Sequence, residues 1–145
     1  MTSNLAAWSP SPKGDLEIKE APMYTVQGDE ILIKVSIHPI SCFKLTKFRL
    51  QNEAIAIQPF DAEIRRNAYI SSIKYPFILG GTVAGTIVEI GPDVTHFKVG
   101  DRVVSDTPVY KKRETRFGGW QKFVVGKAGL SAKVRFEFLF QSVRD

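Results

Sequence analysis

Side chains that could bind a metal or act as nucleophiles are scarce in this sequence. The chain has one cysteine, Cys42, and two histidines, His38 and His96. A catalytic zinc needs about three protein ligands of the Cys, His or carboxylate type, and a solvated turn accounts for each of these isolated histidines. One cysteine can form neither an internal disulfide framework nor a cysteine-rich zinc lobe. The sequence therefore predicts no metal site.

The run LGGTVAG, residues 79–85, offers glycines that could approach a phosphate. Its spacing is not the Gly-x-Gly-x-x-Gly of dinucleotide-binding turns, and no long helical pattern follows it. We therefore expect no dinucleotide-binding site in this run.

A second stretch, QPFDAEIRRNAY at residues 58–69, carries a carboxylate at the start of a predicted helix. Phe60, Ile64 and Ala68 follow Pro59 at four-residue intervals, with no helix breaker between them. Asp61 could take part in chemistry or could simply stabilise the helix N-terminus, where a carboxylate is favourable. These two interpretations are not exclusive.

Most of the remaining chain reads as short strands separated by turns that contain Gly or Pro. The pattern contains one short helix and no alternation of strands with long helices, so a doubly wound sheet is excluded. We expect a mainly β fold, a compact barrel or sandwich. The strands are predicted at 15–20, 30–35, 53–57 and 82–90, and within HFKVGDRVV and GGWQKFVV.

Length and composition are those of one globular domain. The chain has 145 residues, 43% of them hydrophobic and 24% charged. No apolar run reaches the roughly 20 residues that cross a bilayer, and the N-terminus lacks the pattern of a secretory signal. We therefore expect a cytoplasmic protein with no membrane partner.

The net charge of +5 does not indicate a nucleic-acid partner. Three of the positive charges, Lys44, Lys47 and Arg49, lie in one segment, and the run KKRETR at 111–116 is predicted to be a solvated loop. Neither cluster is interleaved with the aromatic residues of a single-strand binder or matches a groove-reading motif.

The run YPFILGGTVAGTIVEIGPDVTHFKVGDRVV, residues 75–104, resembles the N-terminal GroES-like domain of the medium-chain dehydrogenase/reductase superfamily. This resemblance implies a partly open β-barrel with one or two short helices. Nearly every residue that carries it is structural. The matching positions are Pro76, Gly80, Ala84, Gly85, Val88, Gly91, Val94, Phe97, Gly100, Asp101 and Val103.

Zinc-dependent members of the superfamily have Gly-His-Glu where this chain has Gly80-Gly81-Thr82. The chain thus resembles the zinc-independent branch, which includes quinone oxidoreductases and fungal trans-acting enoyl reductases. This branch has Asn-Pro-x-Asp at the start of its first helix, and residues 58–61 read Gln-Pro-Phe-Asp.

The resemblance implies hydride transfer from NADPH or NADH to a small-molecule enone or quinone, without zinc. By it, Asp61 and Tyr69 are expected to be catalytic, and Gln58, Phe60 and Trp120 to contact the cofactor. Tyr69 could instead belong to the core or its rim, and Trp120 could be a buried strand aromatic. Family members hold the cofactor mainly through a Rossmann domain, which this sequence lacks. We therefore expect the chain alone to bind the cofactor weakly and to be inactive.

The segment Val35–Gln51 interrupts a strand that the family continues directly. Without it the sequence reads EILIKNEAIAIQPFD. Its first residues, Val-Ser, can be encoded by GTAAGT, its last residue by CAG, and Leu45-Thr46 by a branch-point-like CTGAC. We interpret the segment as a retained intron, with a genuine insertion loop as the alternative. The expected organisation is a domain at 1–134, including this segment, and a non-family tail at 135–145.

A second functional hypothesis belongs to another class. The chain could be a non-catalytic GroES-like module that binds a ligand or a partner. The motif at residues 58–69 favours descent from an enzyme, because a pure binding module does not need a motif that faces a nicotinamide.

Overall fold

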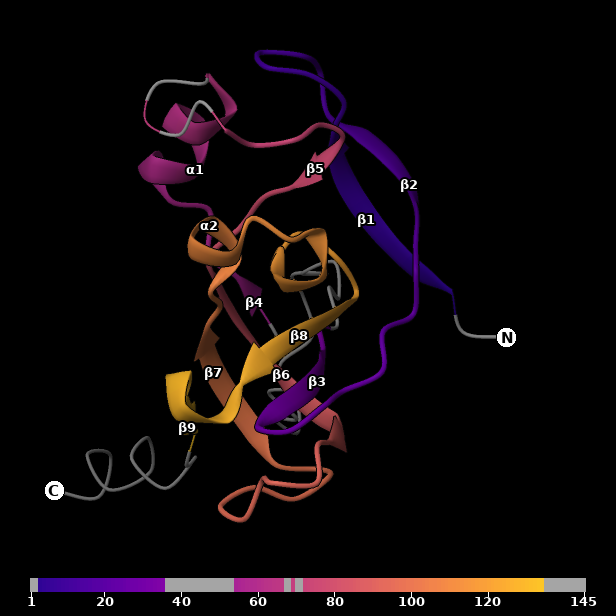
Figure 1. Ribbon diagram of the computed structural model, residues 1–145, viewed down its shortest axis with the longest axis vertical. Helices are drawn as coiled ribbons and strands as arrows, with labels where there is room; N and C mark the ends of the chain where they lie inside the picture. Colours follow the sequence, from indigo (N-terminus) through magenta and orange to yellow (C-terminus); the bar gives the residue numbers. More distant parts are fainter. Residues whose placement is uncertain (1–2, 36–53, 67–68, 70–71, 135–145) are drawn as a thin grey trace, which may run out of the picture.

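The computed structural model describes residues 3–35, 54–66, 69 and 72–134. Its strands form two antiparallel sheets that leave the barrel open (Figure 1). The smaller sheet has the order β2-β1-β5, built from β1 (Asn4–Ser9), β2 (Glu17–Ala21) and β5 (Phe77–Ile78). This architecture confirms the predicted GroES-like, mainly β fold.

The larger sheet has the order β8-β3-β6-β7-β9, and β4 also pairs with β6. Its central strand carries the alternation TVAGTIVEI, which buries Val83, Gly85 and Ile87 on one face. The strands are β3 (Glu30–Lys34), β4 (Ala54–Ile55), β6 (Thr82–Ile90), β7 (Arg102–Asp106), β8 (Phe123–Lys127) and β9 (Ser131–Lys133).

Strands β3 and β4 follow one another along the same edge of β6. Lys34 pairs with Thr86, and Ala54 pairs with Ala84. A single β6 residue therefore separates the partners of Lys34 and Ala54, whereas residues 35–53 separate these two in the sequence. Both strands therefore belong to one sheet. Residues 36–53 lie outside the described residues.

The core lies on both faces of β3, where Ile31, Leu32 and Ile33 are all buried. Ile31 and Ile33 pack with residues of the large sheet, and Leu32 packs on the opposite side with Phe77 and Phe123. This double burial explains why the sequence of β3 is a continuous apolar run.

The helices are short. They are α1 (Pro59–Arg65), α2 (Val109–Lys112) and the 3-10 turns η1 (Thr115–Phe117) and η2 (Ala128–Leu130). Helix α1 ends four residues before Tyr69, the end of the predicted helical pattern. No described helix has both the length and the apolarity to cross a bilayer.

The prediction of a solvated loop at 111–116 is wrong at both ends, although residues 111–114 are exposed: Lys111 and Lys112 belong to α2, and Arg116 is partly buried. Arg116 belongs to η1, its guanidinium bonds the Glu30 carboxylate at 2.7 Å, and it donates to the carbonyl of Thr25 at 3.0 Å. The Glu30 side chain is only 9% exposed, so this charge pair is largely removed from water. Residues distant in sequence supply these partners, and the local charge pattern could not show them.

Candidate functional site

The first helix begins with an arrangement that its sequence encodes directly. Pro59 occupies the first turn, where its missing N–H costs no hydrogen bond. The backbone N–H of Gln58 donates to Asp61 Oδ2 at 2.9 Å, which is one half of a capping box. The capping interpretation of Asp61 is therefore confirmed by geometry.

The second oxygen of Asp61 is also used. Asp61 Oδ1 accepts a short hydrogen bond from the hydroxyl of Tyr110, and this hydroxyl accepts one from the backbone N–H of Gly80 at 3.1 Å. Asp61 is only 1% exposed. Burial, and then the hydrogen bond to Asp61, raise the pKa of the Tyr110 hydroxyl well above its usual value. Asp61 thus ties α1 to α2 and to the turn before β6.

A second chain of hydrogen bonds runs beside the first. Gln58 Nε2 donates to Thr82 Oγ1 at 3.0 Å, and Thr82 Oγ1 donates to Asp106 Oδ1 at 3.1 Å. Thr82 opens β6 and pairs across the sheet with Asp106, the last residue of β7. The five residues of the two chains, called here the polar cluster, are Gln58, Asp61, Thr82, Asp106 and Tyr110.

Aromatic rings flank the polar cluster. The Phe60 ring lies edge-on to Tyr110, with 5.3 Å between the ring centres, and 5.9 Å from the ring of Tyr69. Phe60 is 42% exposed and Tyr69 is 71% exposed. Both rings therefore offer apolar surface to a molecule outside the domain.

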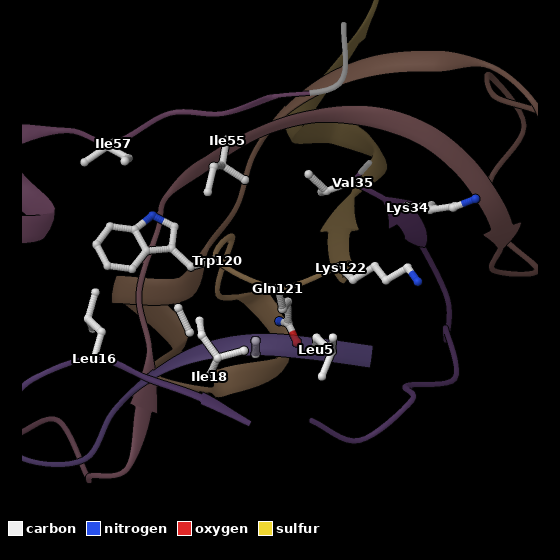
Figure 2. A pocket seen from close by; sticks show the side chains of 12 residues that line it. Leu5, Leu16, Ile18, Lys34, Val35, Ile55, Ile57, Trp120, Gln121 and Lys122 are labelled. Carbon is white, nitrogen blue, oxygen red and sulfur yellow. The ribbon is translucent and has the colours of Figure 1, made fainter. Parts of the chain in front are cut away.

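Trp120 lies elsewhere. Its indole packs against Gly80, which has φ +99°, and a Cβ at this position would come within 2.5 Å of Trp120 Cδ1. The indole also lines a groove together with Leu16, Ile55 and Ile57 (Figure 2). The predicted contact of Trp120 with a cofactor stays a prediction.

Potential metal ligands do not gather in the part of the chain that the structure describes. No three His, Cys, Asp or Glu residues there have a geometry that could hold a metal ion. Exposed His96 lies beside Thr95. His38 and Cys42 lie outside the described residues.

Comparison with known proteins identifies the family. The profile of the alcohol dehydrogenase GroES-like domain matches residues 44–135, more than half of the chain. The chain belongs to this family. The match confirms the resemblance to the medium-chain dehydrogenase/reductase superfamily. Because it starts inside Val35–Gln51, the bounds of the predicted insertion stay a prediction.

Two relatives of this GroES-like domain are named as a dehydrogenase and an enoyl reductase, and a third protein of similar fold was solved with NADPH. Dehydrogenase pigH of Monascus ruber is 34% identical, in an alignment covering 98% of this chain and 35% of pigH. Trans-enoyl reductase himH of Aspergillus japonicus is 31% identical, covering 90% and 33%. Mycobacterial Rv1454c, solved in complex with NADPH, is 27% identical with a TM-score of 0.66, covering 93% and 33%. The GroES-like domain spans about a third of the length of these proteins.

The structure brings together four of the five predicted site residues, and Trp120 lies apart from them. Gln58, Phe60 and Asp61 lie at the start of α1, and Tyr69 contacts them through Phe60. Sequence reasoning did not predict the roles of Thr82, Asp106 and Tyr110. The usable signal was the position of Thr82 and Asp106 at strand ends, which share one edge only once the β6–β7 register is known.

Proposed function

We propose that this GroES-like domain is the substrate-side domain of a zinc-independent NAD(P)H-dependent oxidoreductase, which reduces an enone or a quinone by hydride transfer. Its similarity to an enoyl reductase and to a protein solved with NADPH supports this proposal.

One observation carries the zinc-independent assignment. Thr82 stands where the zinc-dependent pattern has glutamate, and its hydroxyl is engaged with Gln58 and Asp106 rather than free to support a metal ligand. The preceding ligand position is Gly81, which has no side chain to offer.

Gln58 is the residue best placed to act on a substrate carbonyl. Its amide nitrogen gives one N–H to Thr82 and retains a second N–H as a donor. A fixed donor stabilises the negative charge that develops on a carbonyl oxygen during reduction, because it does not have to reorient. Asp61 holds the backbone of Gln58 from inside the fold and acts in our proposal as a positioning residue.

The exposed side chains fit one end of a nicotinamide cofactor. The rings of Phe60 and Tyr69 can cover a flat ring, and Gln58 can donate beside it. When bound, the reduced cofactor would supply the hydride. The longest helix among the described residues has seven residues, so this part of the chain holds no glycine-turn-and-helix cradle for a pyrophosphate.

We also propose the domain organisation. Residues 1–134 form the domain, Val35–Gln51 is inserted in it, and 135–145 is a tail outside the family pattern. The alignment of β3 and β4 along β6 supports the insertion. Sequencing the transcript tests it, since a spliced form should lack codons 35–51 and encode Gly-x-x-Gly-x-x-Gly in a βαβ context downstream.

Activity measurements distinguish an enzyme from a binding module. The 145-residue chain should neither bind NADPH in the micromolar range nor reduce enones, because fixing both reactants is worth up to about 7–11 kcal/mol. A chain without Val35–Gln51, joined after Lys133 to a relative's Rossmann domain, should bind NADPH and reduce an enone. In this joined protein, Gln58→Ala should lower kcat. Lys111→Gln, which changes an exposed lysine of α2 in the same joined protein, is the control and should leave kcat unchanged. A folded joined protein that binds NADPH but reduces no enone or quinone would contradict the proposal.

Metal analysis tests the assignment to the zinc-independent branch. Purified protein should contain no stoichiometric zinc, since the positions of the missing ligands hold Gly81 and Thr82. About one zinc per chain, measured by elemental analysis after dialysis, would contradict this assignment.

A further inference from the structure

An apolar groove lies between the two sheets, with a volume of about 650 Å³. Volumes of roughly 300–1,000 Å³ and mostly apolar walls are typical of sites for small molecules. Strands β1 and β2 form one wall, and β3, β4 and the residues after β4 form the other (Figure 2). The groove is lined by Leu5, Ala6, Ala7, Leu16, Ile18, Lys34, Val35, Ile55, Ile57, Trp120, Gln121 and Lys122.

The walls leave large apolar side chains uncovered. Ile18 is 71% exposed, Ile57 is 75% exposed, and Leu5 is 47% exposed. These side chains come from segments far apart in the sequence and converge on one hollow. Contiguous apolar surface of this kind marks a binding site more often than single exposed residues do.

Among the described residues that line the groove, only two lysines are charged. Figure 2 shows the amino groups of Lys34 and Lys122 at one end of the groove, opposite the indole of Trp120. Among the described residues neither amino group has a carboxylate within 4.0 Å, whereas Lys127 and Lys133 are paired with Asp29 and Asp101.

On β2, the acidic residue Glu20 pairs with Leu5 of β1. Glu20 does not line the groove. The groove is thus apolar along its length and cationic at one end, which is the complement of an amphipathic anion.

We propose that the groove binds a small amphipathic anion, with an acyl or aryl body between Trp120, Ile18 and Ile57, and a carboxylate or phosphate head beside Lys34 and Lys122. The groove shares no residue with the polar cluster. This inference therefore goes beyond the proposed reductase function and can fail independently of it.

Calorimetric titration of the full 145-residue chain with decanoate tests the proposal. Binding should be saturable with one site per chain, and each methylene added between octanoate and dodecanoate should tighten Kd about two- to fourfold. Decyl phosphate should bind as well as decanoate, while decanol should bind at least tenfold more weakly. Acetate and inorganic phosphate should show no binding.

Substitutions test separately the cationic end and the apolar part of the groove. Lys34→Gln with Lys122→Gln should weaken decanoate at least tenfold and leave decanol unchanged. The charge-matched control, Lys111→Gln with Lys112→Gln, removes two exposed lysines from α2 and should change neither Kd by more than about twofold. Ile18→Ser should weaken both ligands, and Val99→Ser, at an exposed position outside the groove, should weaken neither.

Three results would overturn the proposal. The first is absence of saturable decanoate binding by the full chain, which must be folded by circular dichroism. The second is decanoate binding that the double lysine variant does not weaken relative to its control. The third is a dimer in sedimentation that Ile18→Ser dissociates, which would assign the groove to a second copy of the chain.

Discussion

The polar cluster and the apolar groove both touch Gly80, whose N–H donates to Tyr110 and which packs against Trp120 of the groove. They differ in how far their polar groups are hydrogen-bonded and their apolar side chains are covered. In the polar cluster both Asp61 oxygens accept hydrogen bonds, and Thr82 is bonded on both sides. In the groove Ile18 and Ile57 remain mostly exposed, and the two lysines have no acidic partner among the described residues. Most polar groups of the first region are thus used within the fold, while the second leaves apolar surface and two amino groups open to solvent.

The largest expected effect comes from breaking the polar cluster at its centre. Asp61→Ala should lower the free energy of unfolding by about 2–4 kcal/mol, because it leaves the Tyr110 hydroxyl and the Gln58 N–H without their buried acceptor. Urea denaturation measures the loss. Glu63→Ala, on the same helix, removes only an exposed pair with Arg66 and should cost less than about 1 kcal/mol. Equal effects of the two substitutions would contradict a structural role for Asp61.

A deletion tests the segment that connects β3 and β4 in the sequence. Removing residues 36–51, which keeps the buried Val35, should raise the free energy of unfolding by about 2 kcal/mol, since a shorter connection between β3 and β4 closes at a lower entropic cost. Denaturant midpoints and an amide NMR spectrum would show the gain and the retained sheet. An unfolded deletion variant would mean that this segment is part of the fold.

A smaller effect is expected at Tyr110, where it depends on pH. Tyr110→Phe should cost about 1–2 kcal/mol near pH 7, through the lost bonds to Asp61 and Gly80. The pKa of Tyr110 is raised on folding, so its contribution is fully present below the unfolded value of about 10 and is lost as the pH rises above it. The stability difference between the two proteins should therefore narrow above pH 10. A constant difference up to pH 11 would show that the hydroxyl does not ionise more readily in the unfolded chain.

The smallest effect should come from the groove. Ile18→Ser should change the free energy of unfolding by less than about 0.5 kcal/mol, because a side chain that is 71% exposed loses little burial. Ile31→Ser, at a fully buried position of the same apolar type, is the contrasting control and should be strongly destabilising. If Ile18→Ser cost more than about 2 kcal/mol, the groove would be part of the core.

The comparison also shows what the sequence could predict. The alternation in β6 defined that strand to its ends, Thr82 and Ile90, because its side chains are half buried in a regular pattern. The start of α1 could also be predicted from the sequence, since Pro59 and Asp61 both act within its first turn. Strand β1 was not predicted. Its sequence, NLAAWS, has two adjacent alanines in the middle, so apolar and polar residues do not alternate along it.

The remaining features depend on partners that are distant in sequence. Asp106 reaches Thr82 only through the pairing of β6 with β7. The groove needs Ile18 on β2 and Ile57 after β4 to face one another across segments that share no local pattern. Residue spacing carries no information about such contacts, so the polar cluster was predicted in part and the groove not at all.

The junction between β3 and β4 also makes the domain a natural host for guest sequences. Because Lys34 and Ala54 pair with β6 residues only two positions apart, a peptide whose two ends lie close together can enter there without changing the strand order. A fluorescent protein or an affinity tag placed in this junction would sit beside the groove, since Lys34 and Ile55 line it. A reporter attached at this junction would therefore respond to a ligand bound in the adjacent groove.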